Sequence, residues 1–290
     1  MLLKTILQKQ SKLHNIRWET IEQDYILSWV LEGISAIEEL QRNLVFKGGT
    51  ALKKIYFGNY RFSQDLDFSI INPDEIQESL PILINKACRY VTDKLKSLGE
   101  NINIIAEPYL ERLPHPEGQQ AFTIKAKMPW HRDFHTTVYA EFSYQEIILL
   151  RPNLRKIIHP YGNDLEGKIF TYPLEEIVAE KIRALLQFSI KLHERGWGRS
   201  RVRDYYDLWR IVIDFQDVLD WSTIPDLTQS KCIYKHVVYN GIDDIFQEKL
   251  MTNVDNEWEK WLSAVVTDLP PKEEVIAVLK QFFKNNLKWI

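Results

Sequence analysis

The pattern of hydrophobic and polar positions changes period several times along this chain of 290 residues. Residues 1–40 have helical periodicity, clearest over 21–40, where apolar side chains recur at about every third or fourth position. The short apolar run 44–46 is of strand type and ends at two glycines. Residues 50–56 then predict a helix with one apolar side, and 61–71 alternate between apolar and polar positions as a strand does.

The same pattern predicts a helix and three strands in the region that follows. Residues 72–74, Asn-Pro-Asp, end the preceding strand and cap a helix that runs to about residue 98. Residues 101–150 alternate as three strands, separated by turn-rich segments at 114–118 and 128–135. The first part of the chain is therefore expected to contain a mixed sheet flanked by helices.

The remainder of the chain is helical in character. A Tyr-Pro pair introduces a predicted helix over 174–192, and another is predicted over 202–215. Aromatic residues near the C-terminus are expected to supply core or docking surface: Trp258, Trp261, Phe282, Phe283 and Trp289. We therefore expect an α+β protein, with a sheet domain and N-terminal helices over residues 1–170 and a helical domain over 171–290.

Composition narrows the class of protein. With 45% hydrophobic and 27% charged residues, the chain is ordinary for a globular protein, so disorder is not expected to dominate. The net charge of −3 does not by itself indicate nucleic-acid binding. Cys88 and Cys232 have neither metal-ligand nor disulfide spacing, which is typical of a reducing compartment. Because neither a signal peptide nor a long apolar run is evident, we expect a cytoplasmic protein without a membrane partner.

A glycine turn between the first predicted strand and helix is a candidate phosphate site. Gly48 and Gly49 let a ligand approach the backbone, and the first free N–H groups of the following helix point toward it. Thr50 is expected to cap that helix and to donate its hydroxyl to a phosphate oxygen. Taken alone, the same pattern is also consistent with an ordinary turn between a strand and a helix that binds no ligand.

Two aspartates two residues apart form a candidate metal site. On a strand, Asp65 and Asp67 project from one face, while Leu66 and Phe68 bury the other. Two neighbouring carboxylates repel each other, and a divalent cation such as Mg²⁺ (or Mn²⁺) removes that cost. The alternative is a solvated strand face without a ligand.

Together these segments resemble a known family. The runs Lys-Gly-Gly-Thr at 47–50 and Arg-Phe-Ser-Gln-Asp-Leu-Asp-Phe at 61–68 are similar to those of the AbiEii/AbiGii toxin family of nucleotidyltransferases. That family belongs to the polymerase-β-like superfamily, so the resemblance implies its mixed sheet and its metal-dependent chemistry. It also implies a nucleotide-binding set: Lys47, Gly48, Gly49, Thr50, Arg61 and Ser63.

Two later segments extend the resemblance. Residues 176–185 look like the family's Glu-Lys helix, and 203–208 look like its Arg-Asp-x-Tyr-Asp-Leu segment. The helical domain is accordingly expected to complete the active site. The matches cover residues 45–210, while 1–40 and 216–290 carry no recognised motif.

A helical wheel adds an independent expectation for Lys181. It places Lys181 inside the apolar stripe of its helix, so its ammonium needs an anionic partner, either a structural carboxylate or a substrate phosphate. Asp204 and Asp207 also point inward, and we expect one of them to pair with Lys181. The resemblance implies that Lys181 and Asp204 belong to the active site and that Asp207 is structural. The wheel places the remaining polar residues on the solvent side: Glu176, Glu180, Arg183 and Gln187.

Glu141 is the candidate third carboxylate. Superfamily members usually carry one on a later strand, and Glu141 lies in the apolar run 138–143. It is expected to bridge metal ions and to take the proton from the attacking hydroxyl. The alternative is a glutamate on an edge strand.

The loop over 191–203 gathers cations around one tryptophan. One interpretation is a solvated connector. The other is a site for triphosphate or for the backbone of an RNA acceptor, with the tryptophan stacking on a base. The candidate residues are Arg195, Trp197, Arg199 and Arg201.

The expected function is transfer of NMP from an NTP to an acceptor hydroxyl. The resemblance implies a toxin of a toxin–antitoxin or phage-defence system, with a cognate antitoxin protein and RNA, specifically tRNA 3′ ends, as acceptor. Two alternatives remain open on the sequence: a protein nucleotidylating enzyme of the AMPylating type, and a non-catalytic nucleotide-binding module. The sequence does not specify the NTP, the oligomeric state or the role of residues 216–290.

Overall fold

The computed structural model describes residues 2–109, 119–162 and 164–288. The turn expected at 114–118 and Trp289 lie outside these described residues. The chain divides into two compact units, one up to Tyr172 and one from Pro173 onward. No described helix combines the length and the hydropathy needed to cross a membrane.

A mixed sheet forms the centre of the first unit. Its strands within the described residues follow the order β3-β4-β5-β2-β1-β7-β6. Strand β2 pairs in parallel with β5 and antiparallel with β1, and β1 pairs in parallel with β7. The strand bounds are β1 Leu44–Lys47, β2 Asp65–Ile70, β3 Asn103–Tyr109, β4 Gln119–Lys127, β5 Thr136–Ser143, β6 Asn153–Lys156 and β7 Lys168–Thr171.

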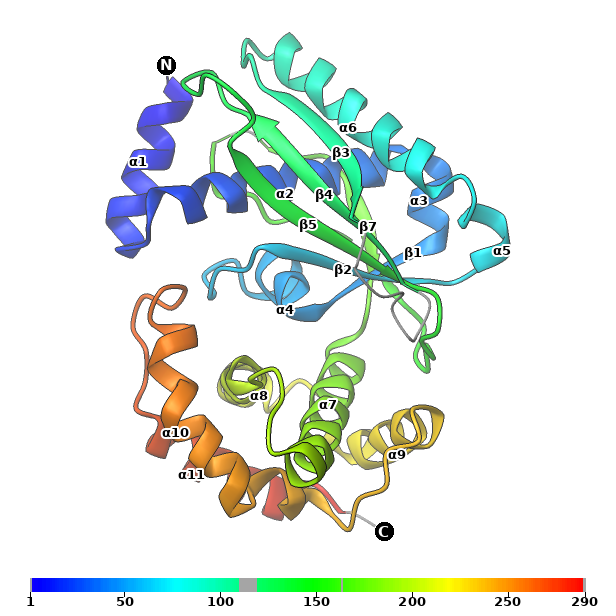
Figure 1. Cartoon of the computed structure of the whole chain (residues 1–290), viewed down its shortest axis with the longest axis vertical. Helices are drawn as coiled ribbons and strands as arrows, with labels where there is room; N and C mark the ends of the chain where they lie inside the picture. The colour runs from blue at the N-terminus through cyan, green and yellow to red at the C-terminus, as the bar shows by residue number, and fades with distance from the viewer. Residues whose placement is uncertain (1, 110–118, 163, 289–290) are drawn as a thin grey trace. The chain divides into compact units, whose positions relative to one another are not determined.

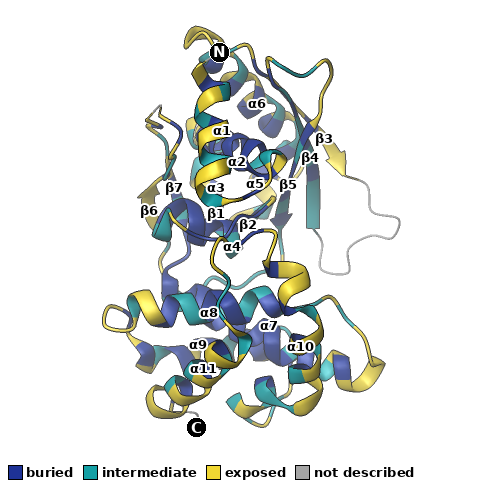
Figure 2. Ribbon diagram, turned by 90° about the vertical axis from the view of Figure 1, so that its left-hand side faces the viewer, coloured by how far each residue is buried: buried dark blue, intermediate teal, exposed yellow. Residues whose placement is uncertain are grey.

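Helices cover one face of this sheet. The helices α2 and α6 pack on the strands, as Figure 1 shows, and the almost wholly buried α2 is dark blue in Figure 2. Apolar residues of β2, β4 and β5 alternate toward them: Leu66, Phe68, Phe122, Ile124, Val138, Ala140 and Phe142. The intervening residues of these strands face the other way, and all of them except the buried Ser69 are at least partly exposed. The helical bounds in this unit are α1 Leu2–His14, α2 Trp18–Ala36, α3 Glu38–Asn43, α4 Gly48–Ala51, a π-helix Leu52–Phe57, α5 Pro73–Ile76 and α6 Leu80–Ser97.

Two local expectations are corrected by the structure. The helix expected from Thr50 begins at Gly48 and continues as a π-helix from Leu52. The single helix expected to residue 98 is two helices, because Pro81 lacks the N–H that a helix interior needs and is placed in the first turn of α6. In addition, the sequence analysis did not predict strands β6 and β7.

The second unit consists of helices. The bounds are α7 Leu174–Arg195, α8 Val202–Phe215, a 3₁₀ turn Trp221–Thr223, α9 Ile224–Tyr234, a 3₁₀ turn Ile242–Phe246, α10 Glu248–Leu262 and α11 Lys272–Asn286. Helix α7 packs against α8, α9 and α10. Trp258 and Phe283 are buried in this unit, whereas Trp261 is exposed. A mixed sheet with helices followed by a helical unit makes the chain α+β, which confirms the predicted fold class.

Two adjacent buried lysines fix the π-helix in the first unit. Lys54 Nζ donates to Asp24 Oδ2 at 2.7 Å and to Ser28 Oγ at 2.8 Å, both on α2. Burial opposes the charge of Asp24, but the ammonium of Lys54 holds the pKa of this carboxyl below its usual value. Lys53 Nζ donates to the carbonyl of Tyr60 at 3.2 Å. The segment after the glycine turn is therefore tied both to α2 and to the chain that enters β2.

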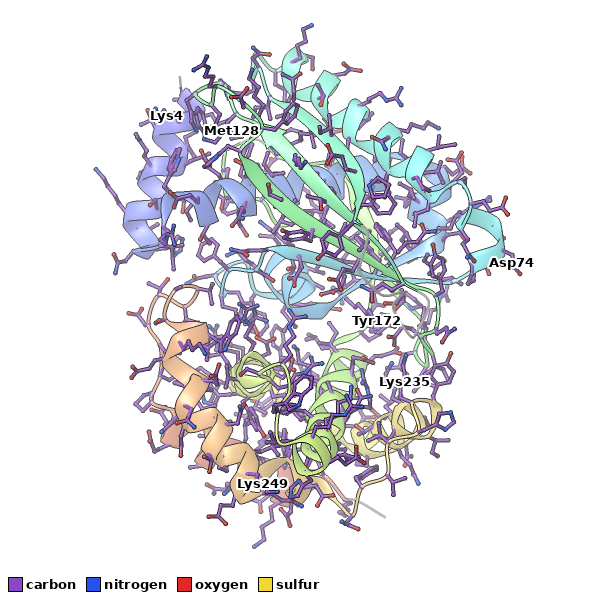
Figure 3. The ribbon with its side chains drawn as sticks, viewed as in Figure 1. Lys4, Asp74, Met128, Tyr172, Lys235 and Lys249 are labelled. Atoms are coloured by element: carbon purple, nitrogen blue, oxygen red, sulfur yellow. The ribbon has the colours of Figure 1, made fainter. Side chains whose placement is uncertain are left out.

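Tyr172, labelled in Figure 3, ties the end of β7 to its neighbours. Its hydroxyl lies 2.8 Å from Ser69 Oγ of β2, and its carbonyl accepts from the Tyr56 hydroxyl at 2.5 Å. Both contacts join segments that are more than a hundred residues apart, so the central strands depend on β7 for their closure.

Because of His159, we expect the first unit to become less stable to unfolding in acid. It contacts the rings of Tyr25, Trp29 and Tyr161, and burial, together with the nearby charge of Lys54, lowers its pKa to about 3. Below about pH 6.5 the unfolded chain binds a proton at His159 that the folded chain does not. The free energy of unfolding therefore decreases as the pH is lowered. We expect this residue to contribute a loss of about 2 kcal/mol between pH 7.5 and 5.0.

The measurement is urea unfolding of the parent and of His159→Phe at several pH values. The variant should lose this part of the acid slope, while effects of other groups cancel in the comparison. Parallel slopes for the two proteins would show that His159 takes up its proton in the folded state.

Candidate active site

The register of three central strands places Lys47, Asp67 and Glu141 side by side. Asp67 on β2 is the direct partner of Lys47 on β1 and of Glu141 on β5. Directly paired residues project from the same face of a sheet, and this is the face not covered by α2 and α6. Asp65 lies two residues before Asp67 and therefore shares that face. The sheet thus places Asp67 and Glu141 in the same row across the strands, and Asp65 in the next row on the same face.

Gly48 makes room for the carboxylate of Asp67. Its φ is +78°, a conformation that other residues rarely adopt, and a Cβ built there would lie 2.2 Å from Asp67 Oδ2. The backbone of the turn and this carboxylate are therefore in direct van der Waals proximity. A side chain at position 48 would displace one of them.

Gly49 makes room for the guanidinium of Arg61 in the same way. A Cβ at Gly49 would lie 2.1 Å from Arg61 Nη2, and Arg61 is only 4% exposed. A guanidinium presents several N–H donors in a planar fork that suits phosphate oxygens. The glycine pair is thus lined by one carboxylate and one guanidinium, which suits a ligand that carries both phosphate and a cation.

The structure corrects the expected role of Thr50. Because the helix begins at Gly48, Thr50 is not its cap; it is fully buried, and its hydroxyl donates to the carbonyl of Asp65 at 2.5 Å. Its hydroxyl therefore ties the turn to the start of β2. Ser63 Oγ donates to Asp65 Oδ1 at 2.6 Å, so it orients that carboxylate.

Lys47 has a carboxylate partner that the sequence did not reveal. Its Nζ lies 3.3 Å from Glu146 Oε1, and both side chains are largely buried. Glu146 follows β5 by three residues and belongs to no recognised motif, so only the fold places it near β1. This pair holds the lysine next to Asp67 and Glu141.

Glu141 occupies an interior strand, so the alternative of an edge-strand glutamate is wrong. Strand β5 lies between β4 and β2. Glu141 Oε2 accepts from Gln119 Nε2 of β4 at 2.8 Å, which orients the carboxylate. Gln119 is a second residue that sequence reasoning missed, because nothing but strand pairing brings it here.

The carboxylates suit a metal that arrives with a nucleotide. Within the described ranges, no three acidic, histidine or cysteine side chains converge to hold a metal ion by themselves. The expected three-carboxylate cluster with Glu141 is therefore not formed in this structure. Asp65 and Asp67 remain as half-exposed hard oxygen donors on one face. Mg²⁺ is commonly held by one or two carboxylates together with substrate phosphates, so this pair fits it.

In the second unit, Lys181 lies between two carboxylates. Its Nζ is 2.6 Å from Asp207 Oδ2 and 2.9 Å from Asp204 Oδ1, and its residue is 6% exposed. Asp204 also lies 3.5 Å from Arg201 Nη1, whereas the side chain of Asp207 is completely buried. Lys181 therefore pairs with both aspartates, where a pair with one of them was predicted.

The solvent side expected for the other polar residues of α7 is partly wrong. Glu176 is completely buried and Arg183 is 9% exposed, because α9 packs against that side of α7. Lys231 of α9 supplies the charge partner, with its Nζ at 3.0 Å from Glu176 and 3.3 Å from Glu180. The helical wheel could not anticipate a helix that arrives about fifty residues later.

Substitution of the two aspartates that flank Lys181 is expected to change the free energy of unfolding by different amounts. Asp207→Asn should lower the free energy of unfolding by about 3 kcal/mol, because it breaks a fully buried charge pair. Asp204→Asn should cost about 1 kcal/mol, since Asp204 is more exposed and Lys181 keeps its stronger partner. Urea unfolding of the two variants measures the difference. Equal losses would show that the two pairs bear equally on stability.

The cationic loop of the second unit remains open to solvent. Helix α7 extends to Arg195 and ends at Gly196, which has a left-handed conformation. Trp197 is 72% exposed, and Arg195 and Arg199 are exposed as well. Arg201 differs from them because it pairs with the first turn of α8. The predicted RNA contacts therefore divide into three accessible residues and one that is already paired.

Comparisons with known proteins bear on the family and the fold of the chain. No curated protein matches the sequence significantly. Among solved structures, the chain is similar in fold to MenT4, a nucleotidyltransferase toxin from Mycobacterium tuberculosis H37Rv, with a TM-score of 0.66, 18% identity, and 98% of this chain and 90% of that chain covered. Residues 29–282 match the family described as nucleotidyl transferase AbiEii toxin, type IV TA system. The chain therefore belongs to the AbiEii family of nucleotidyltransferase toxins, as its sequence motifs predicted.

Proposed function

We propose that the chain transfers NMP from an NTP to a hydroxyl of an RNA acceptor, a tRNA 3′ end, and that the reaction depends on Mg²⁺ or Mn²⁺. The observation that carries this proposal is the single face that holds Asp65, Asp67 and Glu141 beside the Gly48–Gly49 turn. Oxygen donors for a cation and a glycine backbone for phosphates are the two elements that nucleotidyl transfer needs.

Each residue has a stated part in the proposed reaction. Asp65 and Asp67 would hold the divalent cation, and the chemistry that it would supply is neutralisation of negative charge on the phosphates. Arg61 and the backbone of the glycine turn bind the terminal phosphates. Glu141, oriented by Gln119, accepts the proton of the attacking hydroxyl.

The residues of the second unit have proposed parts in the same reaction. Lys181 and Asp204 would take part in the transfer, as the resemblance to the family implies, and the exposed loop residues Arg195, Trp197 and Arg199 would bind the RNA. As a toxin of a type IV system, the chain would act in the cytoplasm and be counteracted by a cognate antitoxin.

The test is incubation with each labelled NTP, Mg²⁺ and a cell extract, followed by digestion with RNase or protease. Label that RNase removes supports the proposal, and EDTA should abolish its incorporation. Label that only protease removes would establish the second candidate, a protein nucleotidylating enzyme, which the net charge of −3 favours. If the protein binds NTP but incorporates label from none of the four NTPs, it is a non-catalytic nucleotide-binding module.

A further inference from the structure

Two exposed tyrosines lie on the same face of the sheet as the carboxylates, and no role has been assigned to them so far. Tyr139 of β5 is 40% exposed and Tyr109, the last residue of β3, is 49% exposed. Their rings contact each other edge to face, with centroids 6.1 Å apart and planes at 81°. Large aromatic rings left exposed on a strand bury little apolar surface, so they contribute little to the core of this unit.

The two rings meet across the strand that separates them. In the register of the sheet, Tyr109 is opposite Ala121 of β4, and Thr123 of β4 is opposite Tyr139. Both intervening side chains are small, which lets the rings touch over β4 although their strands are not neighbours. The result is an aromatic surface that reaches from β3 across β4 to β5.

This surface continues the row of carboxylates. Tyr139 is the direct partner of Asp65 on the neighbouring strand β2. Tyr109 belongs to the row that passes through Ala121 and Glu141 to Asp67. The tyrosines and the carboxylates therefore project from the same face, and the tyrosines lie on the opposite side of β2 from β1 and the glycine turn.

The direction of the transfer reaction assigns an occupant to this side. In an in-line displacement at the α-phosphorus, the attacking hydroxyl and the leaving pyrophosphate are on opposite sides of the phosphorus. In the proposed function, the glycine turn and Arg61 bind the part of the nucleotide that leaves as pyrophosphate, and they lie next to β1. The hydroxyl must then approach from the side of β5, where the tyrosines lie.

We propose that Tyr139 and Tyr109 form a stacking platform for an unpaired nucleobase at the reacting end of the RNA acceptor. This rests on the proposed function, of which it names the acceptor subsite. Unpaired bases stack on exposed aromatic side chains of sheets without regard to sequence. Lys125 and Lys127 of β4 project from the same face and supply positive charge near the backbone of the bound strand. Lys125 is paired with Glu107 at 2.6 Å, so this charge is partly balanced.

The test compares three variants in transfer and in direct binding. Tyr139→Leu removes the ring, Tyr139→Phe keeps it, and Tyr90→Leu makes the same change at a tyrosine of α6 that is 39% exposed on the helical side of the unit. Steady-state transfer gives the KM for RNA and for NTP separately. Fluorescence anisotropy with a short single-stranded RNA oligonucleotide, without NTP, gives binding alone. Thermal unfolding confirms that each variant folds.

Loss of the ring should raise the KM for RNA, and the Kd for the oligonucleotide, about tenfold, with the KM for NTP changed less than about twofold. Tyr139→Phe and Tyr90→Leu should behave as the parent does. Tyr109→Leu should have an effect of the same kind. The proposal is overturned if Tyr139→Leu matches Tyr90→Leu, or if the KM for NTP rises instead, which would assign the platform to the base of the nucleotide.

The two proposals fail in distinguishable ways. If the parent transfers NMP to RNA but the tyrosine variants bind the oligonucleotide equally well, the platform is wrong and the function stands. If the parent labels no RNA yet binds the oligonucleotide through Tyr139, the proposed function is wrong and the aromatic surface is an RNA site of another purpose.

Discussion

Replacing Asp67 by Asn should lower the rate of NMP transfer by about 1,000-fold or more, because each lost carboxylate ligand removes several kcal/mol of charge stabilisation. Asp67 is the central member of the row with Lys47 and Glu141, so its loss also leaves the turn without its carboxylate neighbour. The same result is expected for Asp65→Asn. Transfer of labelled NMP under saturating Mg²⁺ measures the effect, and thermal unfolding should show Tm values close to that of the parent.

A matched control is Asp74→Asn, which makes the same chemical change on α5 at an exposed position labelled in Figure 3. It should leave transfer unchanged. Activity within about tenfold of the parent for both Asp65→Asn and Asp67→Asn would remove these residues from the chemistry, since ligand loss cannot be so mild. A large fall in Tm for either variant would assign it a structural role.

The second large effect is expected for Gly48→Ala. Two costs combine there: a positive φ of +78°, which strains any residue with a Cβ, and a Cβ that would lie 2.2 Å from Asp67 Oδ2. Relief requires the turn or the carboxylate to move, and displacement of about 1 Å in an active site can cost 100-fold in rate. We expect kcat/KM for NTP to fall at least 100-fold, and the free energy of unfolding to fall by about 1–3 kcal/mol.

Gly99→Ala separates the two costs. Gly99 has almost the same φ, +82°, but a Cβ there would meet nothing within 4 Å. It should show only the loss of stability, with transfer unchanged. If Gly48→Ala also affects stability alone, the contact with Asp67 has no bearing on catalysis. Kinetics and urea unfolding of the two variants side by side provide the comparison.

Sequence patterns predicted the parts of the site that depend on local chain geometry. The alternation around Asp65 and Asp67 indicated their common face, because Leu66 and Phe68 bury the opposite one. The helical wheel of α7 indicated that Lys181 points inward and needs an anionic partner, and the structure supplies two carboxylates. In each case the information lies within a few residues of the side chain concerned.

Features that depend on long-range pairing were not accessible in this way. Glu146 and Gln119 reach Lys47 and Glu141 only through the strand order, which no local pattern specifies. Thr50 was misplaced as a cap because the left-handed glycine before it starts the helix two residues early. The buried charge of Glu176 depends on α9, which no motif connects to α7.

Strand pairing also bears on when the toxin gains activity during synthesis. The parallel neighbour of β2 is β5, whose first residue, Thr136, follows Asp65 by about seventy positions, and the parallel neighbour of β1 is β7, which ends at Thr171. Closing such long loops precedes any gain from the contacts they bring. A nascent chain shorter than about 171 residues therefore contains both aspartates without a completed sheet to orient them. Translation products that end before β7 is complete are therefore expected to be inactive.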